Sequence, residues 1–393
     1  MKKVIKIVLM VLAIVAVGGI IGVFTLGPRL VEESVNSFVT AQAPSVATEV
    51  ESLHERLFIA DLHADSLLWG RNLLERADYG HVDVPRLIEA NVALQVFSVF
   101  TKVPRARSYD RTEADSDLVT WFTLIQRWPL ASWSSLTERA LYQARQLADA
   151  AERSGGRLTL IRSVADLKRH LQRRDRDSNV TAGILAIEGL HAIEANLENL
   201  DLLYRAGYRM IGLTHHFDNA VAGSAHGVEK GGLTELGKQA VARMEALSII
   251  VDLAHASPQA IEETLDIATR PVVVSHTGVA ATCPGPRNLT DQQVQRIAET
   301  GGVIGIGYFE AAICGLEPDD FAKAVRHIVD LVGIDHVGLG SDFDGAVRTK
   351  FDVTGLPYIT ESLLEAGFTD QEIEQIMGGN VLRLLDELLP RDG

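Results

Sequence analysis

The chain has 393 residues, 47% of them apolar, with a mean hydropathy of +0.11 and a formal net charge of −15. This acidic balance argues against nucleic acid and anionic lipid surfaces as partners, because both are bound by clustered Lys and Arg. The two cysteines, Cys283 and Cys314, are too few for a disulfide scaffold. We expect two isolated thiols, with a single bridge as the alternative because both follow predicted strands.

The first 30 residues form an element of their own. Three lysines precede an uncharged apolar run over residues 7–27, which ends at Pro28. At about 1.5 Å per residue, this run spans roughly the hydrocarbon core of a bilayer. The lysines favour a cytoplasmic amino terminus. We therefore predict a single-pass signal-anchor in the cytoplasmic (inner) membrane over residues 1–30, with the catalytic domain on the periplasmic or extracellular side. The alternative is a secreted protein whose signal peptide is cleaved.

Residues 31–50 are small and polar without an apolar period, which predicts a flexible tether before a catalytic domain over 51–393. Buried parallel strands read as continuous Val, Ile and Leu runs. Eight such runs predict strands at 57–62, 92–99, 183–188, 209–214, 249–254, 271–275, 302–308 and 336–341.

Helical signals separate most of these strands. Thr290 and Thr369 begin capping-box patterns, and residues 104–178 predict a helical insertion between the second and third strands. Its longest helix is expected to end at Gly155. Alternating strands and helices predict an α/β protein, a (β/α)8 TIM-type barrel of the metal-dependent hydrolase kind.

Metal-competent side chains stand where these apolar runs end. His63 and Asp65 are two residues apart, so a strand would present both on one face, and Glu188, His255 and His276 end three other strands. Imidazole and carboxylate without thiolate suit zinc, with Mn²⁺, Co²⁺ or Fe²⁺ as alternatives. Five ligands exceed the three of a mononuclear catalytic zinc. Two metals that share one carboxylate account for all five, and such a pair can hold a bridging hydroxide as nucleophile.

Over about residues 55–388, the chain resembles the membrane dipeptidase (renal dipeptidase) family of binuclear zinc peptidases. The strings that carry the resemblance occur in the family's order: DLHAD, AIEGLHAI, LTHHFDNAVAGSA, VDLAHAS, VVVSHTGV, CPGPRNLTD and GLGSDFDG. The resemblance implies a barrel in which His63, Asp65 and Glu188 hold one zinc ion. Glu188 would bridge to a second ion held by His255 and His276. Family members are often dimers, so a homodimer is a further expectation.

The resemblance also implies roles for His215, Asp342 and Arg287, and each role makes chemical sense. His215 would donate a hydrogen bond to the developing oxyanion. Asp342, after the last strand, would take the proton of the attacking water and pass it to the leaving amine. The Arg287 guanidinium would hold the free carboxylate of a dipeptide. Tyr308 ends the seventh strand and is expected to line the substrate pocket.

Other polar residues receive structural roles. We expect His216 to point to the opposite face of its strand, and Asp344 to support loop geometry. His191 would either orient Glu188 or pack at a helix start. The remaining histidines are expected on the surface or on helices: His226, His327 and His336.

Together these features predict a membrane-anchored, zinc-dependent dipeptidase. The resemblance suggests that it also accepts a D-residue at the second position, and hydrolyses some β-lactams. One alternative is another binuclear amidohydrolase acting on an amide, lactone or β-lactam. Such enzymes commonly bridge their metals with a modified lysine, and none of the eight strand ends carries one. The other alternative is a non-catalytic membrane-tethered binding protein, which the complete ligand set argues against.

Overall fold

The structure, a computed structural model, describes residues 1–40 and 45–392. Eight parallel strands lie in the order β3-β2-β10-β9-β8-β7-β6-β5, and pairing of β3 with β5 closes the ring. The strands are β2 (Ile59–Ala64), β3 (Val92–Phe100), β5 (Thr181–Glu188), β6 (Tyr208–Gly212), β7 (Ile250–Asp252), β8 (Val273–Thr277), β9 (Val303–Ile306) and β10 (Val337–Leu339). The predicted (β/α)8 barrel is confirmed.

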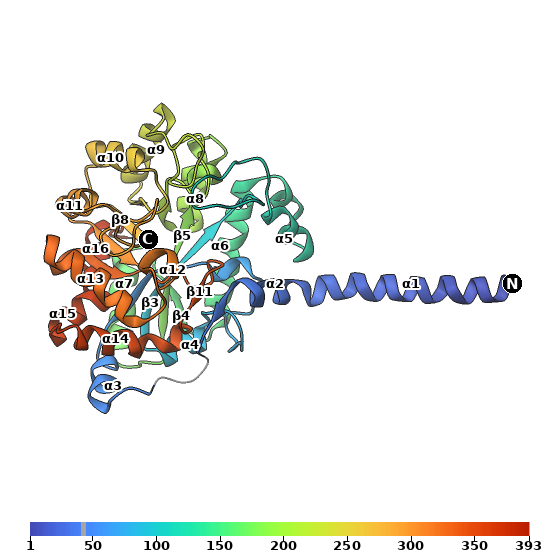
Figure 1. Ribbon diagram of the computed structural model, residues 1–393, viewed down its shortest axis with the longest axis horizontal. Coiled ribbons are helices and arrows are strands. Elements are labelled where there is room, and N and C mark those ends of the chain that lie inside the picture. The colour runs from blue at the N-terminus through green and yellow to red at the C-terminus, as the bar shows by residue number, and fades with distance from the viewer. Residues whose placement is uncertain (41–44, 393) are drawn as a thin grey trace.

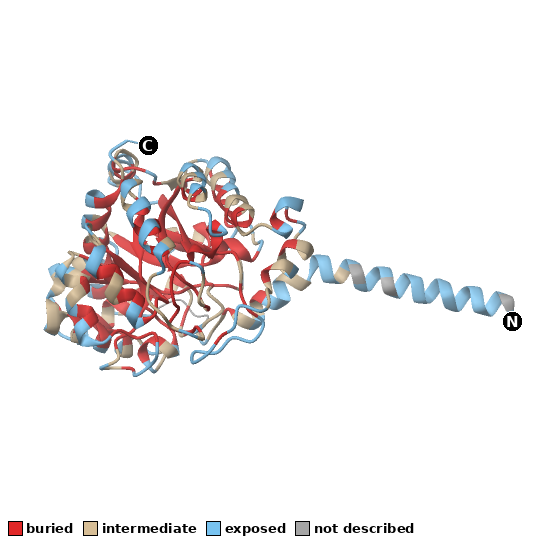
Figure 2. Cartoon of the chain, turned by 90° about the horizontal axis from the view of Figure 1, so that it is seen from above, coloured by how far each residue is buried: buried red, intermediate tan, exposed pale blue. Residues whose placement is uncertain are grey.

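Every one of the eight predicted strands overlaps a barrel strand. All residues of these strands are buried, as Figure 2 shows, because side chains on one face fill the barrel and those on the other meet helices. Four strands end two residues earlier than predicted, among them β6 at Gly212 and β10 at Leu339. Asp342, three residues beyond Leu339, has a left-handed backbone with φ 61°, which does not continue a strand.

Helices cover the outside of the barrel. Apart from the helices in the segment over residues 104–178, they are α3 (Thr48–His54), α4 (Val84–Glu89), α8 (Glu198–Ala206), α9 (Glu235–Ala246), α10 (Pro258–Ile267), α11 (Asp291–Glu299), α12 (Glu310–Ile313), α13 (Pro318–Val332), α14 (Leu356–Glu365), α15 (Asp370–Glu374) and α16 (Asn380–Leu388). Thr290 and Thr369 form the predicted capping boxes of α11 and α15.

The segment predicted as a helical insertion contains α5 (Val119–Ile125), α6 (Leu136–Arg153) and α7 (Val164–Arg174). The side chain of Ser135 caps α6, and the helix ends just before Gly155, whose φ of 64° suits a residue without a side chain. The segment also contains a short strand that sequence reasoning missed, β4 (Leu158–Leu160), paired with the beginning of β5.

The amino-terminal apolar run forms α1 (Lys2–Thr25), which projects away from the barrel (Figures 1 and 2). With a mean hydropathy of 3.0 over its most apolar window, it is long and apolar enough to cross a membrane. A signal sequence at this position would have the same properties.

The segment predicted as a flexible tether is instead partly folded onto the barrel domain. Helix α2 (Gly27–Val35) and strand β1 (Ser37–Phe38) precede residues 41–44, which lie outside the described residues. β1 pairs in parallel with β11 (Arg348–Thr349), a strand more than 300 residues away. Contacts between distant segments order this part of the chain, and a local polar pattern does not reveal them.

The two cysteines form a disulfide, so the expectation of isolated thiols is wrong. Cys283 follows β8 and Cys314 follows β9, and their Cα atoms lie 5.3 Å apart. The carboxyl ends of neighbouring parallel strands lie at the same end of the barrel, which brings these two loops together.

Candidate active site

Residues from six strands or the loops after them meet at the carboxyl end of the barrel. His63 lies in β2, Glu188 ends β5, and His276 lies in β8. The others follow β2, β6, β7 and β10 by one to three residues: Asp65, His215, His255 and Asp342. All of these residues are buried.

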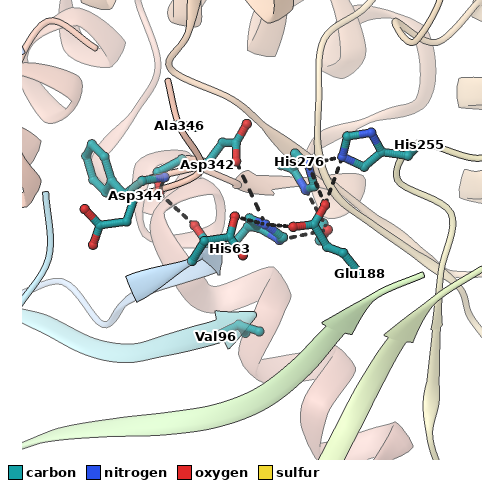
Figure 3. A network of polar contacts seen from close by, with 12 residues as sticks. His63, Val96, Glu188, His255, His276, Asp342, Asp344 and Ala346 are labelled. Atoms are coloured by element: carbon teal, nitrogen blue, oxygen red, sulfur yellow. Dashed lines mark hydrogen bonds and ion pairs between the residues drawn. The ribbon is translucent and has the colours of Figure 1, made fainter. Parts of the chain in front are cut away.

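Glu188 lies at the centre of this cluster and divides its two carboxylate oxygens between two groups (Figure 3). Its Oε1 is 3.1 Å from His63 Nε2, which is also 3.3 Å from Asp65 Oδ2. Its Oε2 is 3.0 Å from His255 Nε2 and 3.8 Å from His276 Nε2. The Nε2 atoms of His255 and His276 are themselves 2.9 Å apart. The five predicted ligands therefore converge as two sets that share Glu188.

The chemistry of this donor set fits divalent cations. Burial raises the pKa of Glu188 to about 8, and burial lowers the pKa of His255 and His276 well below the usual histidine value. The neighbouring Asp65 carboxylate also raises the pKa of Glu188, so negative charge is concentrated here, and the neutral imidazoles of His255 and His276 offer lone pairs. Asp65 Oδ1 is buried and has no hydrogen-bond partner among the residues that the structure describes. A divalent cation would balance the charge of the carboxylates and accept the lone pairs of the imidazoles. His63, Glu188 and His276 form one of the groups whose spacing could hold such an ion.

Buried polar residues orient the cluster from below, and sequence reasoning missed them. Ser275 Oγ lies 2.9 Å from His276 Nδ1 and donates to Asp252 Oδ2 at 2.6 Å. These hydrogen bonds fix the imidazole ring of His276 so that its other nitrogen, Nε2, faces Glu188. Asp61 accepts hydrogen bonds from Ser341 in the same way, next to Asp342. The available signal was an acid inside an apolar run, as in IIVDLAH.

A cavity of about 260 Å³ opens above the cluster. Asp342 lines it, with Oδ1 3.9 Å from His63 Nε2, and burial raises the pKa of Asp342 to about 7. His215 lines it too, with Nε2 3.3 Å from Glu188 Oε2. The Arg287 guanidinium donates from one edge to the His276 carbonyl at 2.6 Å, while its Nε has no partner within the described part of the chain. Arg287 thus lines the cavity and carries one buried donor that lacks a partner among the described residues.

Several structural expectations for other residues are wrong. His216 and His226 both line the cavity. The prediction for His216 assumed that strand alternation continues, but β6 ends at Gly212. Tyr308 is absent from the cavity wall formed by the described residues, because its ring packs against Phe321 and Phe343 beneath it.

The remaining expectations have mixed outcomes. His191 packs on Phe217, and neither ring nitrogen has a hydrogen-bond partner in residues 1–40 and 45–392, so it packs rather than orients Glu188. His327 and His336 lie on or beside the outer helix α13, as expected. The cavity wall also includes residues from the loop after β3 that sequence reasoning missed, among them Arg107 and Tyr109.

Comparison with known proteins relates the chain to one family over most of its length. Residues 47–389 match the family described as Membrane dipeptidase (Peptidase family M19). Dipeptidase verJ of Clonostachys rogersoniana is 31% identical over 315 residues, which cover 78% of this chain and 76% of that protein. An uncharacterized protein in the pqqA 5'region of Klebsiella pneumoniae is 35% identical, over 59% of this chain and 89% of that protein.

Solved structures give the same relationship. The chain is similar to a metallo peptidase from Rhodobacter sphaeroides, liganded with a phosphinate mimic of the dipeptide L-Ala-D-Ala, with a TM-score of 0.71 and 25% identity. This match covers 84% of this chain and 99% of that one.

Proposed function

This chain belongs to the membrane dipeptidase family and is a metal-dependent dipeptidase, and from this premise we propose which residues carry the reaction. The observation that carries the proposal is the position of Glu188, whose two oxygens face separate groups of ligands. A carboxylate so placed suits a bridge between two ions.

We assign two zinc ions to the cluster. His63, Asp65 and Glu188 would hold one, and Glu188, His255 and His276 the other, with Mn²⁺, Co²⁺ or Fe²⁺ as substitutes. When bound, such ions activate water and polarise a carbonyl. Zinc is preferred because three of the five ligands are imidazoles, a ligand type that suits zinc.

Three other residues would bind the substrate and move protons. The guanidinium group of Arg287, which lines the cavity, would hold the terminal carboxylate of the dipeptide. His215 would donate from Nε2 to the oxyanion that develops at the peptide carbonyl. Asp342 would accept the proton of the attacking water at Oδ1 and return it to the leaving amine. A pKa near 7 suits a group that both accepts and donates a proton at neutral pH.

The substrate class follows from the same geometry. Arg287 lies beside the metal ligands, so a carboxylate held there would place the adjacent peptide bond over the cluster. We propose that the enzyme cleaves dipeptides, including those with a carboxyl-terminal D-residue. The Rhodobacter sphaeroides enzyme, liganded with an L-Ala-D-Ala mimic, supports this extension. Activity toward some β-lactams is a second extension of the same site.

For localisation, we propose that α1 anchors the protein in the cytoplasmic membrane as a single span, with the barrel on the periplasmic or extracellular side. The disulfide between Cys283 and Cys314 supports this side, because such bonds persist in oxidising compartments. Secretion after cleavage of α1 is the alternative. The expected homodimer would be tested by light scattering of the detergent-solubilised protein.

The deciding experiment measures amino-acid release by the full chain in detergent. The substrates are L-Ala-L-Ala, L-Ala-D-Ala and L-Ala-L-Ala amide, each with chelator-treated and zinc-restored enzyme. We expect both free dipeptides to be cleaved only with metal, and the amide to be cleaved at least about tenfold more slowly because Arg287 loses its partner. Equal cleavage of the amide would contradict the role of Arg287. No cleavage of L-Ala-D-Ala would contradict the extension to D-residues.

A further inference from the structure

The loop that carries Asp342 has an unusual backbone. Asp342, Asp344 and Ala346 all adopt left-handed conformations, with φ of 61°, 62° and 59°. Residues with side chains rarely adopt this conformation, and it persists only where surrounding contacts enforce it. We call residues 342–347 the Asp342 loop. Because it lines the cavity, contacts that hold its shape also hold Asp342 over the metal ligands.

Asp344 is the buried attachment point of this loop. Its carboxylate accepts hydrogen bonds from the His81 backbone at 2.6 Å and from Ser66 Oγ at 2.5 Å, and it pairs with Arg71. Its own N–H donates to His81 Nδ1 at 2.9 Å. Although burial opposes ionisation, Arg71 and the hydrogen bonds lower the pKa of Asp344 below its usual value. Ser66 directly follows Asp65, so Asp344 ties the loop to the metal cluster.

Residues 27–40, which we call the N-terminal strap, supply further contacts to the same loop. Glu32 on α2 is 0% exposed and accepts a hydrogen bond from Arg71, the residue that also pairs with Asp344. Asn36 Oδ1 accepts the backbone N–H of Ala346 at 2.8 Å. The strap thus contacts the loop through one shared arginine and one direct hydrogen bond.

Backbone pairing continues this contact beyond the loop. Ser37 and Phe38 in β1 pair with Arg348 and Thr349 in β11, and Thr40 N donates to the Lys350 carbonyl at 2.9 Å. In Figure 1, α2 and β11 lie next to each other where α1 meets the barrel domain. The strap therefore runs alongside residues 346–350.

We infer that the N-terminal strap is a positioning element of the active site rather than a spacer between membrane and enzyme. It enforces the left-handed backbone of the Asp342 loop, through Glu32 and Asn36, and so fixes the distance between Asp342 and the metal ligands. The effect on catalysis rests on the proposed function, whereas the effect on loop structure does not. Neither Glu32 nor Asn36 touches the cavity, so both act through the loop.

The test compares substitutions in the full chain, purified in detergent with zinc bound. Asn36→Ala removes the acceptor of the Ala346 N–H, and Glu32→Gln replaces by an amide the carboxyl group that accepts from Arg71. The matched controls are Ser34→Ala and Glu33→Gln, adjacent residues of α2 whose side-chain contacts lie outside the loop. We expect hydrogen exchange of the Asp342 loop to become about tenfold faster in both test variants and in neither control.

Kinetics then separate positioning from general loss of structure. We expect kcat for L-Ala-L-Ala to fall about fivefold in Asn36→Ala, with KM within about twofold and zinc content unchanged, since Arg287 and the ligands are untouched. Exchange in β5 should remain at the wild-type rate. Loop exchange and kcat equal to those of the controls would overturn the inference. If Glu32→Gln does not fold, Asn36→Ala decides alone. If the wild type cleaves no dipeptide, the proposed function fails, and loop exchange still decides the role of the strap.

Discussion

At the scale of single residues, two aspartates in one loop illustrate how surroundings assign roles. Asp344 pairs with Arg71, and that cation holds the pKa of its carboxyl below the usual range. Burial instead raises the pKa of Asp342 to about 7, with His63 Nε2 3.9 Å away. The first carboxylate stays charged and holds the loop, whereas the second can exchange a proton at neutral pH. Residue type and spacing alone do not distinguish them.

We expect Asp342→Asn to lower kcat by about 10² to 10⁴ because the amide cannot accept the proton of the attacking water. Zinc content and melting temperature should match the wild type, measured by elemental analysis and calorimetry. Asp330→Asn, at an exposed position of α13, is the control. Glu188→Gln should instead have a lower zinc content than the wild type, because Glu188 is proposed as a ligand of both ions. Activity of Asp342→Asn within about twofold of the wild type would show that another group handles the proton.

At the scale of elements, the loop over residues 278–290 presents Arg287 to the cavity. Its Leu289 N–H donates to the Gly278 carbonyl, and Asn288 Nδ2 donates to the carbonyls of Cys283 and Ala311. The disulfide joins the loop to Cys314 at the end of α12. These links connect two neighbouring loops of the barrel, so the arginine is held by both.

The double variant Cys283→Ser with Cys314→Ser tests this element. Opening a closure between residues 31 apart should lower the free energy of unfolding by about 2–4 kcal/mol. We expect KM to rise more than kcat falls, because the loop carries the carboxylate anchor and no proton-transfer group. Urea unfolding and steady-state kinetics measure the two effects, with reductant-treated wild type as the comparison. An unchanged KM would mean that hydrogen bonds alone place Arg287.

At the scale of the whole molecule, two buried histidines far from the cavity couple stability to pH. Burial lowers the pKa of His54 and of His170 to about 4. Both are neutral in the folded protein, whereas in the unfolded chain they protonate near pH 6.5. Their contribution to stability is therefore complete above pH 6.5 and is lost as the pH falls from 6.5 toward 4.

We expect His54 to account for a loss on the order of 1–2 kcal/mol in the free energy of unfolding between pH 7 and pH 5. The measurement is urea unfolding of the wild type and His54→Gln at both pH values. Any effect of acid on the metal site is the same in both proteins and cancels in their difference. The difference in free energy of unfolding between wild type and His54→Gln should therefore be smaller at pH 5 than at pH 7. A gap of constant size would mean that His54 titrates normally in the folded protein.

A second prediction at this scale concerns the boundary of the folded unit. Removal of residues 1–26 should release a soluble enzyme with the kcat/KM of the full chain, because α1 lies outside the barrel domain. Removal of residues 1–44 should lower the melting temperature and kcat/KM, because it deletes α2 and β1. Calorimetry and dipeptide hydrolysis compare the two fragments. Equal melting temperatures and equal kcat/KM values for the two fragments would show that the strap is only a tether.

Much of this organisation could be read from the sequence, for physical reasons. The eight strands are buried on both faces, so each is a continuous apolar run. The convergence of His63, Glu188 and His276 was predictable because the carboxyl ends of barrel strands share one end of the barrel. The predictions for His216 and Tyr308 failed because they depended on where a strand ends and which way a ring packs. Such details depend on neighbours supplied by other segments.

The sequence by itself determined the barrel, the apolar amino-terminal helix and the set of candidate metal ligands, since each follows from local pattern and strand order. Only the tertiary structure decided that Cys283 and Cys314 pair, that His226 lines the cavity, and that the N-terminal strap contacts the Asp342 loop. The contact between Asn36 and Ala346 joins residues 310 positions apart. Contacts at that separation leave no periodic signal in the sequence. They form only when the completed barrel places the segment before its first strand beside the segment after its last strand.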